Sequence, residues 1–279
     1  MGTKRAVGAS LLVLMFFVVP VDRADTIISE SGAGKFLKWE PTDLKNNGKP
    51  FWDNKSVDGT NRTQRITSNV GFQLTGKSDE SPAPVPEDEQ GPLPYWGKEG
   101  KAKKKTGGNA DLNFYFQRNG LTNGAILTLE MDSLSNSVEF GWYDKADPSV
   151  KHPIILGSDS PSTDVITFSP TALQYGFYLM RTNQATFYTE SRLNPFKDTS
   201  HQHFAVFQES ADQGAEVYWI GIEDRTRREL KGKEGGLGDY NDMLIRIGIE
   251  YATPVPEPST VVLVLSGALL TAWLRQRRR

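Results

Sequence analysis

The chain has 279 residues, of which 37% are hydrophobic and 24% are charged, with a net charge of −2 and no cysteine. The absence of cysteine excludes disulfides, thiol nucleophiles, cysteine–zinc sites and iron–sulfur clusters. Without the two termini treated below, residues 25–254 keep 25 of 32 basic and 32 of 34 acidic residues, a net charge of −7, which argues against nucleic acid as a partner.

Residues 1–24 have the pattern of a secretory signal peptide. Two basic residues precede an apolar run, Ala6–Val19, which ends at Pro20. Ala24 supplies the small residue expected before a cleavage site, although Asp22 stands where a second small residue is preferred. We therefore expect cleavage after Ala24 and export of the remainder. A retained signal anchor is the alternative, and the shortness of the run argues against it.

The first half of the body is irregular in composition. Two segments before the first clear strands, KPFWDNKSVDGT (49–60) and SNVGFQL (68–74), are interpreted as turn and strand material. Residues 76–108 contain SPAPVPEDEQGPLP and KEGKAKKKTGG, so they are rich in proline and in charge. This composition predicts an exposed loop within a single domain, residues 25–254.

Short alternations of apolar and polar residues, separated by turn signals, fill the rest of the body. Such alternation predicts half-buried strands, and many short strands predict an all-β fold, an antiparallel β-sandwich or jelly roll. The predicted segments are 110–118 (with Leu112, Phe114 and Phe116 on one face), 123–131, 137–144, 164–170, 185–190, 203–210, 216–224 and 242–252.

Polar residues cluster where the last two predicted strands face their connecting loop. Glu223 and Asp224 end one strand, and Asp239, Asn241 and Asp242 begin the other. If these strands pair as a hairpin, both clusters fall at the same end. Calcium takes six to eight oxygen ligands in flexible geometry, so we predict a calcium site here. The alternative is that the acids only cap the turn and keep it soluble.

This region resembles the C-terminal "ED … DYND" pattern of a domain of unknown function found in exported bacterial proteins. The matching residues are Glu223, Asp224, Asp239, Tyr240, Asn241 and Asp242. FGWYD, FYTESRLN and HQHFAVFQ are similar in texture, so the resemblance extends from about Phe51 to Tyr251. It implies a fold, export and calcium binding, without an enzymatic activity.

Two further kinds of chemistry are open. Glu223 and Asp239 could form the carboxylate pair of a glycosidase, with Trp142 and Trp219 stacking on sugar, but strand tryptophans are more often core residues. His201 and His203 share one face of a predicted strand and could begin a zinc site, which needs further ligands. The alternative is a packed or hydrogen-bonded histidine pair, and His152 is the remaining histidine.

Residues 255–279 have three parts. They are the motif Pro256-Glu257-Pro258, the apolar run Val261–Leu274, and a basic tail with Arg275, Arg277, Arg278 and Arg279. As a helix, the run would span roughly 21 Å, whereas the bilayer core is about 30 Å thick. The basic tail places the body on the outer side of the membrane.

This tail closely resembles the PEP-CTERM sorting signal of Gram-negative bacteria, many of which make extracellular polysaccharide. The resemblance implies recognition by an exosortase, a membrane-embedded cysteine protease that cuts near the Pro-Glu-Pro motif. The expected protein is therefore exported, held transiently at the inner membrane by a short transmembrane helix, and then placed at the cell surface or in a biofilm matrix. A non-enzymatic, calcium-stabilised protein associated with exopolysaccharide is favoured. A carbohydrate-binding module is the first alternative, and a polysaccharide hydrolase is the second.

Overall fold

The computed structural model describes residues 25–39, 50–52, 69–74, 94–99, 109–118, 125–132, 138–156, 166–181, 185–195, 198–209, 217–224, 226 and 240–248. Both predicted terminal signals, residues 1–24 and 255–279, lie outside these ranges, and so does Asp239. Within the described ranges, no helix has the length and apolar character needed to cross a membrane.

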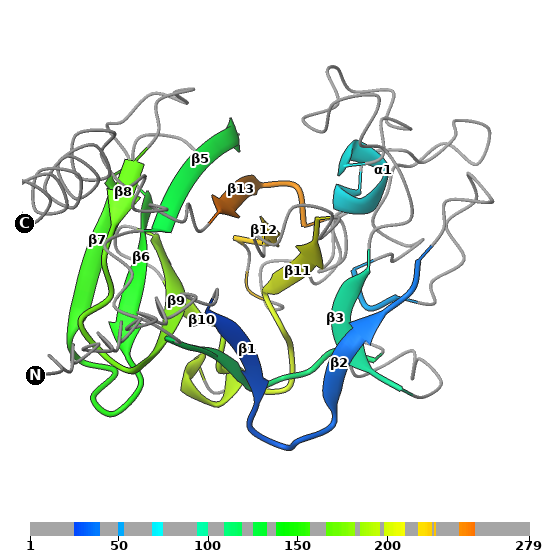
Figure 1. The fold of residues 1–279 in the computed structure, drawn as a ribbon, viewed down its shortest axis with the longest axis horizontal. Helices are drawn as coiled ribbons and strands as arrows, with labels where there is room; N and C mark the ends of the chain where they lie inside the picture. Colours follow the sequence, from blue (N-terminus) through cyan, green and yellow to red (C-terminus); the bar gives the residue numbers. More distant parts are fainter. Residues whose placement is uncertain are drawn as a thin grey trace, which may run out of the picture.

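Two antiparallel sheets make up the fold (Figure 1). The first sheet has the order β1-β4-β9-β6-β7, and β10 also pairs with β9. Its strands are β1 (Thr26–Ser29), β4 (Phe114–Gln117), β6 (Val138–Asp144), β7 (Lys151–Leu156), β9 (Gln174–Arg181) and β10 (Thr186–Tyr188). The second sheet has the order β2-β3-β11-β12-β13-β5-β8. Its strands are β2 (Gly34–Leu37), β3 (Tyr95–Lys98), β5 (Ala125–Asp132), β8 (Ile166–Phe168), β11 (Phe204–Gln208), β12 (Val217–Ile222) and β13 (Met243–Gly248).

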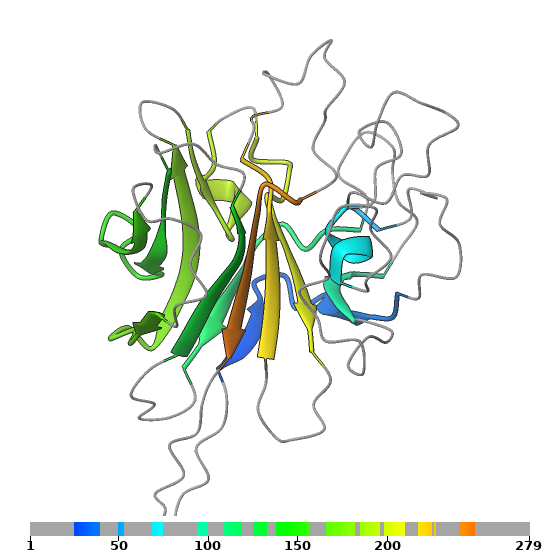
Figure 2. The same cartoon turned by 90° about the horizontal axis from the view of Figure 1, so that it is seen from above.

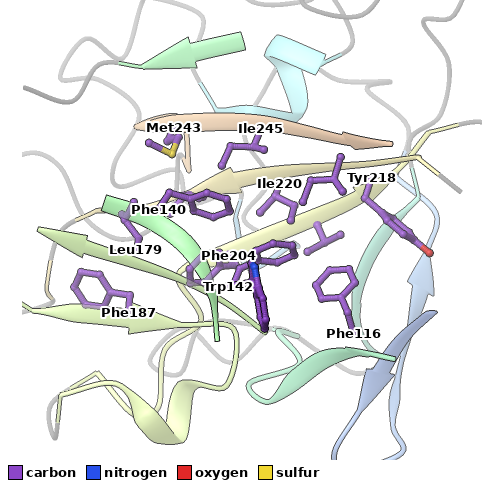
Figure 3. Packing of buried hydrophobic residues seen from close by; sticks show 14 of the residues in the cluster. Phe116, Phe140, Trp142, Leu179, Phe187, Phe204, Tyr218, Ile220, Met243 and Ile245 are labelled. Carbon is purple, nitrogen blue, oxygen red and sulfur yellow. The ribbon is translucent and has the colours of Figure 1, made fainter. Parts of the chain in front are cut away.

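The sheets form two layers that share one apolar core (Figures 2 and 3). Phe116 of β4 and Tyr218 of β12 meet across the layers with ring centroids 6.1 Å apart. Phe168 of β8 and Phe177 of β9 meet at 5.8 Å. Burial of these large side chains from both sheets is the main force that holds the layers together. The prediction of an all-β, antiparallel fold is confirmed, while its jelly-roll form stays a prediction.

A second apolar cluster covers the outer face of the second sheet. Trp52, Val70 and Leu74 pack there, and the sheet side of the cluster includes Phe207 and Trp219. The remaining buried members are Trp39, Phe51, Tyr95, Ala110, Ala205, Tyr240 and Leu244. The segment 68–74, interpreted as turn and strand material, is therefore corrected to the helix α1 (Val70–Leu74). Val70 and Leu74 stand four residues apart, so a helical turn brings both side chains onto the sheet.

The predicted loop 76–108 contains a strand, so that prediction is wrong at β3. Its first three residues, Tyr95, Trp96 and Gly97, are buried, because β3 pairs with β2 on one side and β11 on the other. The Trp96 indole N–H donates to Asp111 Oδ2 at 3.1 Å, which satisfies this buried donor. Burial of Tyr95 and Trp96 favours a strand here, although the surrounding sequence is rich in proline and in charge.

All eight segments predicted as strands contain one, namely β4, β5, β6, β8, β10, β11, β12 and β13. The placement of three side chains on one face of residues 110–118 is corrected. Phe114 and Phe116 enter the core between the sheets, whereas Leu112 packs against the outer cluster. Leu112 precedes the strand, so the strand alternation does not extend to it.

Candidate metal centre

The pairing of β12 with β13 brings the described residues of the two predicted acidic clusters to one end. The strands pair antiparallel, and Ile222 at the end of β12 lies opposite Met243 at the start of β13. Glu223 and Asp224 follow directly after the first strand, and Asp242 directly precedes the second. The predicted hairpin geometry is thus confirmed. Each strand is fixed in register by its apolar face, so the acids have no freedom to slide apart.

Three carboxylates converge at this end. Oxygens of Glu223, Asp224 and Asp242 all lie within 4.8 Å of one another. Glu223 is 2% exposed and Asp224 is 5% exposed, while Asp242 is half-buried. The backbone N–H of Asp224 donates to Asp242 Oδ2 at 2.9 Å, which fixes the two loop ends against each other. Buried carboxylates need close compensating partners, and a bound metal ion is one such partner.

Arg181 joins this cluster from the other sheet. It ends β9, and its Nε lies 3.5 Å from Asp224 Oδ2, while its Nη1 donates to the Asp224 carbonyl at 3.3 Å. The acid cluster therefore lies where the end of β9 in the first sheet approaches the end of β12 in the second. Nothing in the sequence around Arg181 marks it as a partner of these acids, because only the packing of the two sheets brings it there.

Backbone contacts hold both sides of the cluster. The Glu223 N–H donates to the His203 carbonyl at 3.0 Å, and His203 Nδ1 lies 3.0 Å from the Glu223 carbonyl. On the opposite side, Tyr240 has φ of 53°, a left-handed conformation that costs a non-glycine residue roughly 1 kcal/mol. Its buried ring packs edge-on against Phe51, and its hydroxyl donates to the Gln202 carbonyl. Packing of Tyr240 thereby fixes the end of the connecting segment that leads through Asp242 into β13.

The donor set decides which kind of ion fits. Carboxylate oxygens are hard ligands that suit calcium, magnesium or manganese, whereas zinc and copper sites are built mainly from nitrogen and sulfur. A cluster of three acids, two of them buried, could hold such a metal ion. Asn241 is half-buried beside Asp242 and carries an amide oxygen that calcium sites also use.

Of the predicted site residues, Glu223, Asp224 and Asp242 come together. Asn241 lies next to them in the turn. The positions of Asp239, of Pro256, Glu257 and Pro258, and of Arg275, Arg277, Arg278 and Arg279 lie outside the described residues. The glycosidase pair of Glu223 and Asp239 therefore stays a prediction.

The tryptophans and histidines of the two alternative predictions lie outside the acid cluster. Trp142 and Trp219 are buried in the two apolar clusters, as their strand positions indicate. In the part of the chain that the structure describes, the acid trio is the only group of three or more histidine, cysteine or acidic side chains close enough to hold a metal.

His203 is a packed and hydrogen-bonded side chain, and His201 is buried with its Nδ1 3.0 Å from the Ser200 hydroxyl, as in the alternative to a zinc site. The His203 ring stacks on Phe187 with centroids 3.8 Å apart, and it is fully buried. Burial lowers the pKa of His203 to about 3, so the imidazole is neutral and its Nδ1 donates to the Glu223 carbonyl. Asp198 Oδ1 is 3.9 Å from Nε2, too far for a hydrogen bond, so burial dominates.

No protein-family model matches the sequence, and neither a curated protein nor a solved structure shows significant similarity to it.

Proposed function

We propose that the protein is exported and non-enzymatic, acts at the cell surface or in an exopolysaccharide matrix, and is stabilised by calcium bound at Glu223, Asp224 and Asp242. The signal peptide, the PEP-CTERM-like tail and its expected processing by an exosortase support the location. One observation carries the role of the ion, namely the convergence of three carboxylates within 4.8 Å at the ends of two paired strands.

Calcium suits this position for two reasons. Three carboxylates that lie so close repel one another, and a divalent cation between them turns that repulsion into attraction. The chain also lacks cysteine, so an ion that joins the two ends of a hairpin supplies a cross-link that disulfides provide in other exported proteins. Calcium accepts irregular coordination geometry, whereas magnesium requires a near-ideal octahedron. One half-buried and two buried acids at the end of a hairpin supply irregular coordination more readily than an octahedral one.

The carbohydrate-binding alternative gains no support from the tryptophans that the structure describes. All the tryptophans in the described ranges, Trp39, Trp52, Trp96, Trp142 and Trp219, are buried core residues. A sugar-stacking platform needs exposed aromatic faces. We therefore propose that contact with polysaccharide occurs through polar or ionic groups rather than through tryptophan stacking in this part of the chain.

Calcium is expected to raise the melting temperature of the purified protein by about 5–10 °C relative to EDTA. A ligand at 100 times its dissociation constant adds about 2.7 kcal/mol to the free energy of unfolding, and a domain of this size gains roughly 2–4 °C per kcal/mol. Magnesium should give a smaller shift, because it requires stricter octahedral geometry and releases its water reluctantly. Thermal unfolding followed by circular dichroism measures the shift.

The matched control compares two sets of carboxylate changes. The double variant Asp224→Asn, Asp242→Asn should lose the calcium-dependent shift, because it removes two of the three carboxylates. Asp147→Asn changes an exposed acid in the turn after β6 and should keep the full shift. Equal melting temperatures of the wild type with calcium and with EDTA would contradict the proposal.

A further inference from the structure

The first sheet has an outer face that is turned away from the shared core, and β6, β7 and β9 of this sheet lie side by side in Figure 1. Tyr115, Tyr178 and Tyr188 lie on the outer face, because side chains alternate along a strand and the residue before each of them enters the core. Those preceding residues are Phe114, Phe177 and Phe187.

Two lysines extend over these tyrosine rings. The Lys145 ammonium lies 4.3 Å from the ring centroid of Tyr115, and the Lys151 ammonium lies 5.4 Å from the centroids of both Tyr178 and Tyr188. The negative face of an aromatic ring attracts a cation at such a distance. Both lysines are half-buried, so their ammonium groups are held at defined places on the surface. We call these five residues the tyrosine–lysine face.

Neither lysine forms an ion pair with a carboxylate that the structure describes, since none lies within 4.0 Å of either ammonium group. Two acids of the same sheet region are bonded to other donors. Glu139 Oε1 accepts from the Tyr178 hydroxyl at 2.5 Å. The fully buried Glu190 accepts from the Tyr143 hydroxyl at 2.8 Å and from Arg192 at 2.6 Å. The two ammonium groups therefore keep the capacity to bind an anion from outside the protein.

Two glycines let tyrosine rings lie along this sheet. A Cβ atom at Gly141 would lie 2.8 Å from the Tyr178 hydroxyl oxygen and 2.9 Å from its Cε1, so the ring of Tyr178 lies across Gly141. The Tyr143 ring lies across Gly176 in the same way. Small-molecule sites are typically concave. Rings that lie along the strands give a flatter surface, which suits an extended polymer better than a small ligand.

We propose that the tyrosine–lysine face binds an acidic polysaccharide whose sugar units carry carboxylates, a proposal that rests on the place assigned to the protein in an exopolysaccharide matrix. Such a polymer repeats its charge along the chain, so one chain can contact both ammonium groups, and the second contact forms within a complex that already exists. Because the cation–π contacts hold the lysines in place, binding immobilises them at a lower entropic cost.

The acidic balance of the protein is compatible with this partner. Residues 25–254 have a net charge of −7, but at physiological salt the Debye length is about 8 Å, so distant acids are screened and the local lysines dominate. Asp144 and Asp147, in the turn beside Lys145, accept hydrogen bonds from backbone N–H groups of that turn.

Surface plasmon resonance with immobilised alginate, a polyuronate, provides the test. The full chain is purified in non-ionic detergent and measured in EDTA, so calcium bound to the protein or to the polymer makes no contribution. We expect binding to alginate that weakens as the salt concentration rises, and no binding to the neutral polymer dextran. The double variant Lys145→Gln, Lys151→Gln should bind alginate about 10-fold more weakly, because it loses two surface charge contacts.

Two further double variants serve as controls. Lys35→Gln, Lys38→Gln removes the same charge in and just after β2 of the second sheet and should keep the full affinity. Lys145→Arg, Lys151→Arg keeps both cations over the rings and should also keep it. The proposal is overturned if the wild type does not bind alginate, if it binds dextran equally well, or if both glutamine variants lose the same affinity. Equal alginate binding by the wild type and all variants would retain the matrix association and overturn the tyrosine–lysine face. Calcium binding at the acid cluster is measured separately, so its failure is distinguishable from a failure here.

Discussion

Replacing Gln202 by glutamate is expected to lower the melting temperature by about 10 °C, through a loss of roughly 3–4 kcal/mol of unfolding free energy. Gln202 is buried, and its amide has two distinct sides. Its Nε2 group donates to the carbonyls of Asp111, Leu112 and Thr189 at 3.1, 3.3 and 2.9 Å. Its Oε1 accepts from the N–H groups of His203 and Phe204 at 2.9 and 3.1 Å.

The effect is large because glutamate keeps the shape and loses every donor. A carboxylate oxygen would face carbonyl oxygens that belong to the chain before β4 and to the end of β10, and a buried charge would lie among them. These segments meet at Gln202, so the substitution weakens the junction of the first sheet with the start of β11. Thermal and urea unfolding of the purified variant measure the loss.

Two companion variants separate the effect of the introduced charge from the effects of the lost hydrogen bonds and of the buried position. Gln202→Met keeps the length without charge, and it should destabilise less than Gln202→Glu while still leaving buried backbone groups without partners. Gln208→Glu changes a half-buried glutamine at the end of β11 and should cost less than about 1 kcal/mol. A Gln202→Glu protein that melts within 2 °C of the wild type, taken as roughly 1 kcal/mol, would contradict this role.

Acidification from pH 7 to pH 5 is expected to cost the wild type about 2 kcal/mol through His203 alone. Burial lowers the pKa of His203 from 6.5 to about 3 in the folded protein. Between these values the unfolded state binds a proton that the folded state does not bind. The stabilising effect of the neutral ring is therefore complete above pH 6.5 and is lost progressively as the pH falls toward 3.

The variant His203→Asn isolates this contribution. The asparagine side-chain N–H can replace Nδ1 as donor to the Glu223 carbonyl, but it does not titrate. Its unfolding free energy, measured by urea unfolding at pH 7, 6 and 5, should fall by about 2 kcal/mol less than that of the wild type. Parallel pH profiles for the two proteins would exclude a strongly lowered pKa, as would an NMR titration of His203 near pH 6.5.

The sequence predicts strands that clear turn signals delimit. β11, β12 and β13 follow such signals, so their positions were predictable although these strands are largely buried on both faces. β9 was not predicted, and its central residues, from Tyr175 to Leu179, are likewise buried on both faces and show no alternation. Phe177 and Leu179 enter the core, while Tyr178 lies on the other face with its hydroxyl bonded to Glu139. Such two-sided burial depends on neighbours that are distant in the chain.

Edge strands were missed for a different reason. β7 contains Pro153, which has no backbone N–H to donate to a neighbouring strand. Proline is found mainly in edge strands, and it weakens the sequence signal for a strand. β1 and β2 are four residues each, too short for a periodic pattern. In each case the strand is stabilised by one neighbour across the sheet, and this information is not local in the sequence.

The candidate metal centre was predictable in its local part. Glu223, Asp224 and Asp242 flank two strong strand signals, so hairpin pairing alone brings them together. Arg181 and His203 were not predicted as neighbours of these acids. Both reach the cluster only after the layers pack, Arg181 through the end of β9 and His203 through the start of β11.

Direct measurement of calcium binding is the sharpest test of the candidate metal centre. Equilibrium dialysis of the purified, metal-stripped protein against calcium at millimolar and lower concentrations counts bound ions without reference to stability. One calcium ion is expected at the acid cluster of each chain, and the Asp224→Asn, Asp242→Asn variant is expected to lose that ion. Binding that is absent in the wild type, or equal in the wild type and the double variant, would contradict a calcium site at the end of the β12–β13 hairpin.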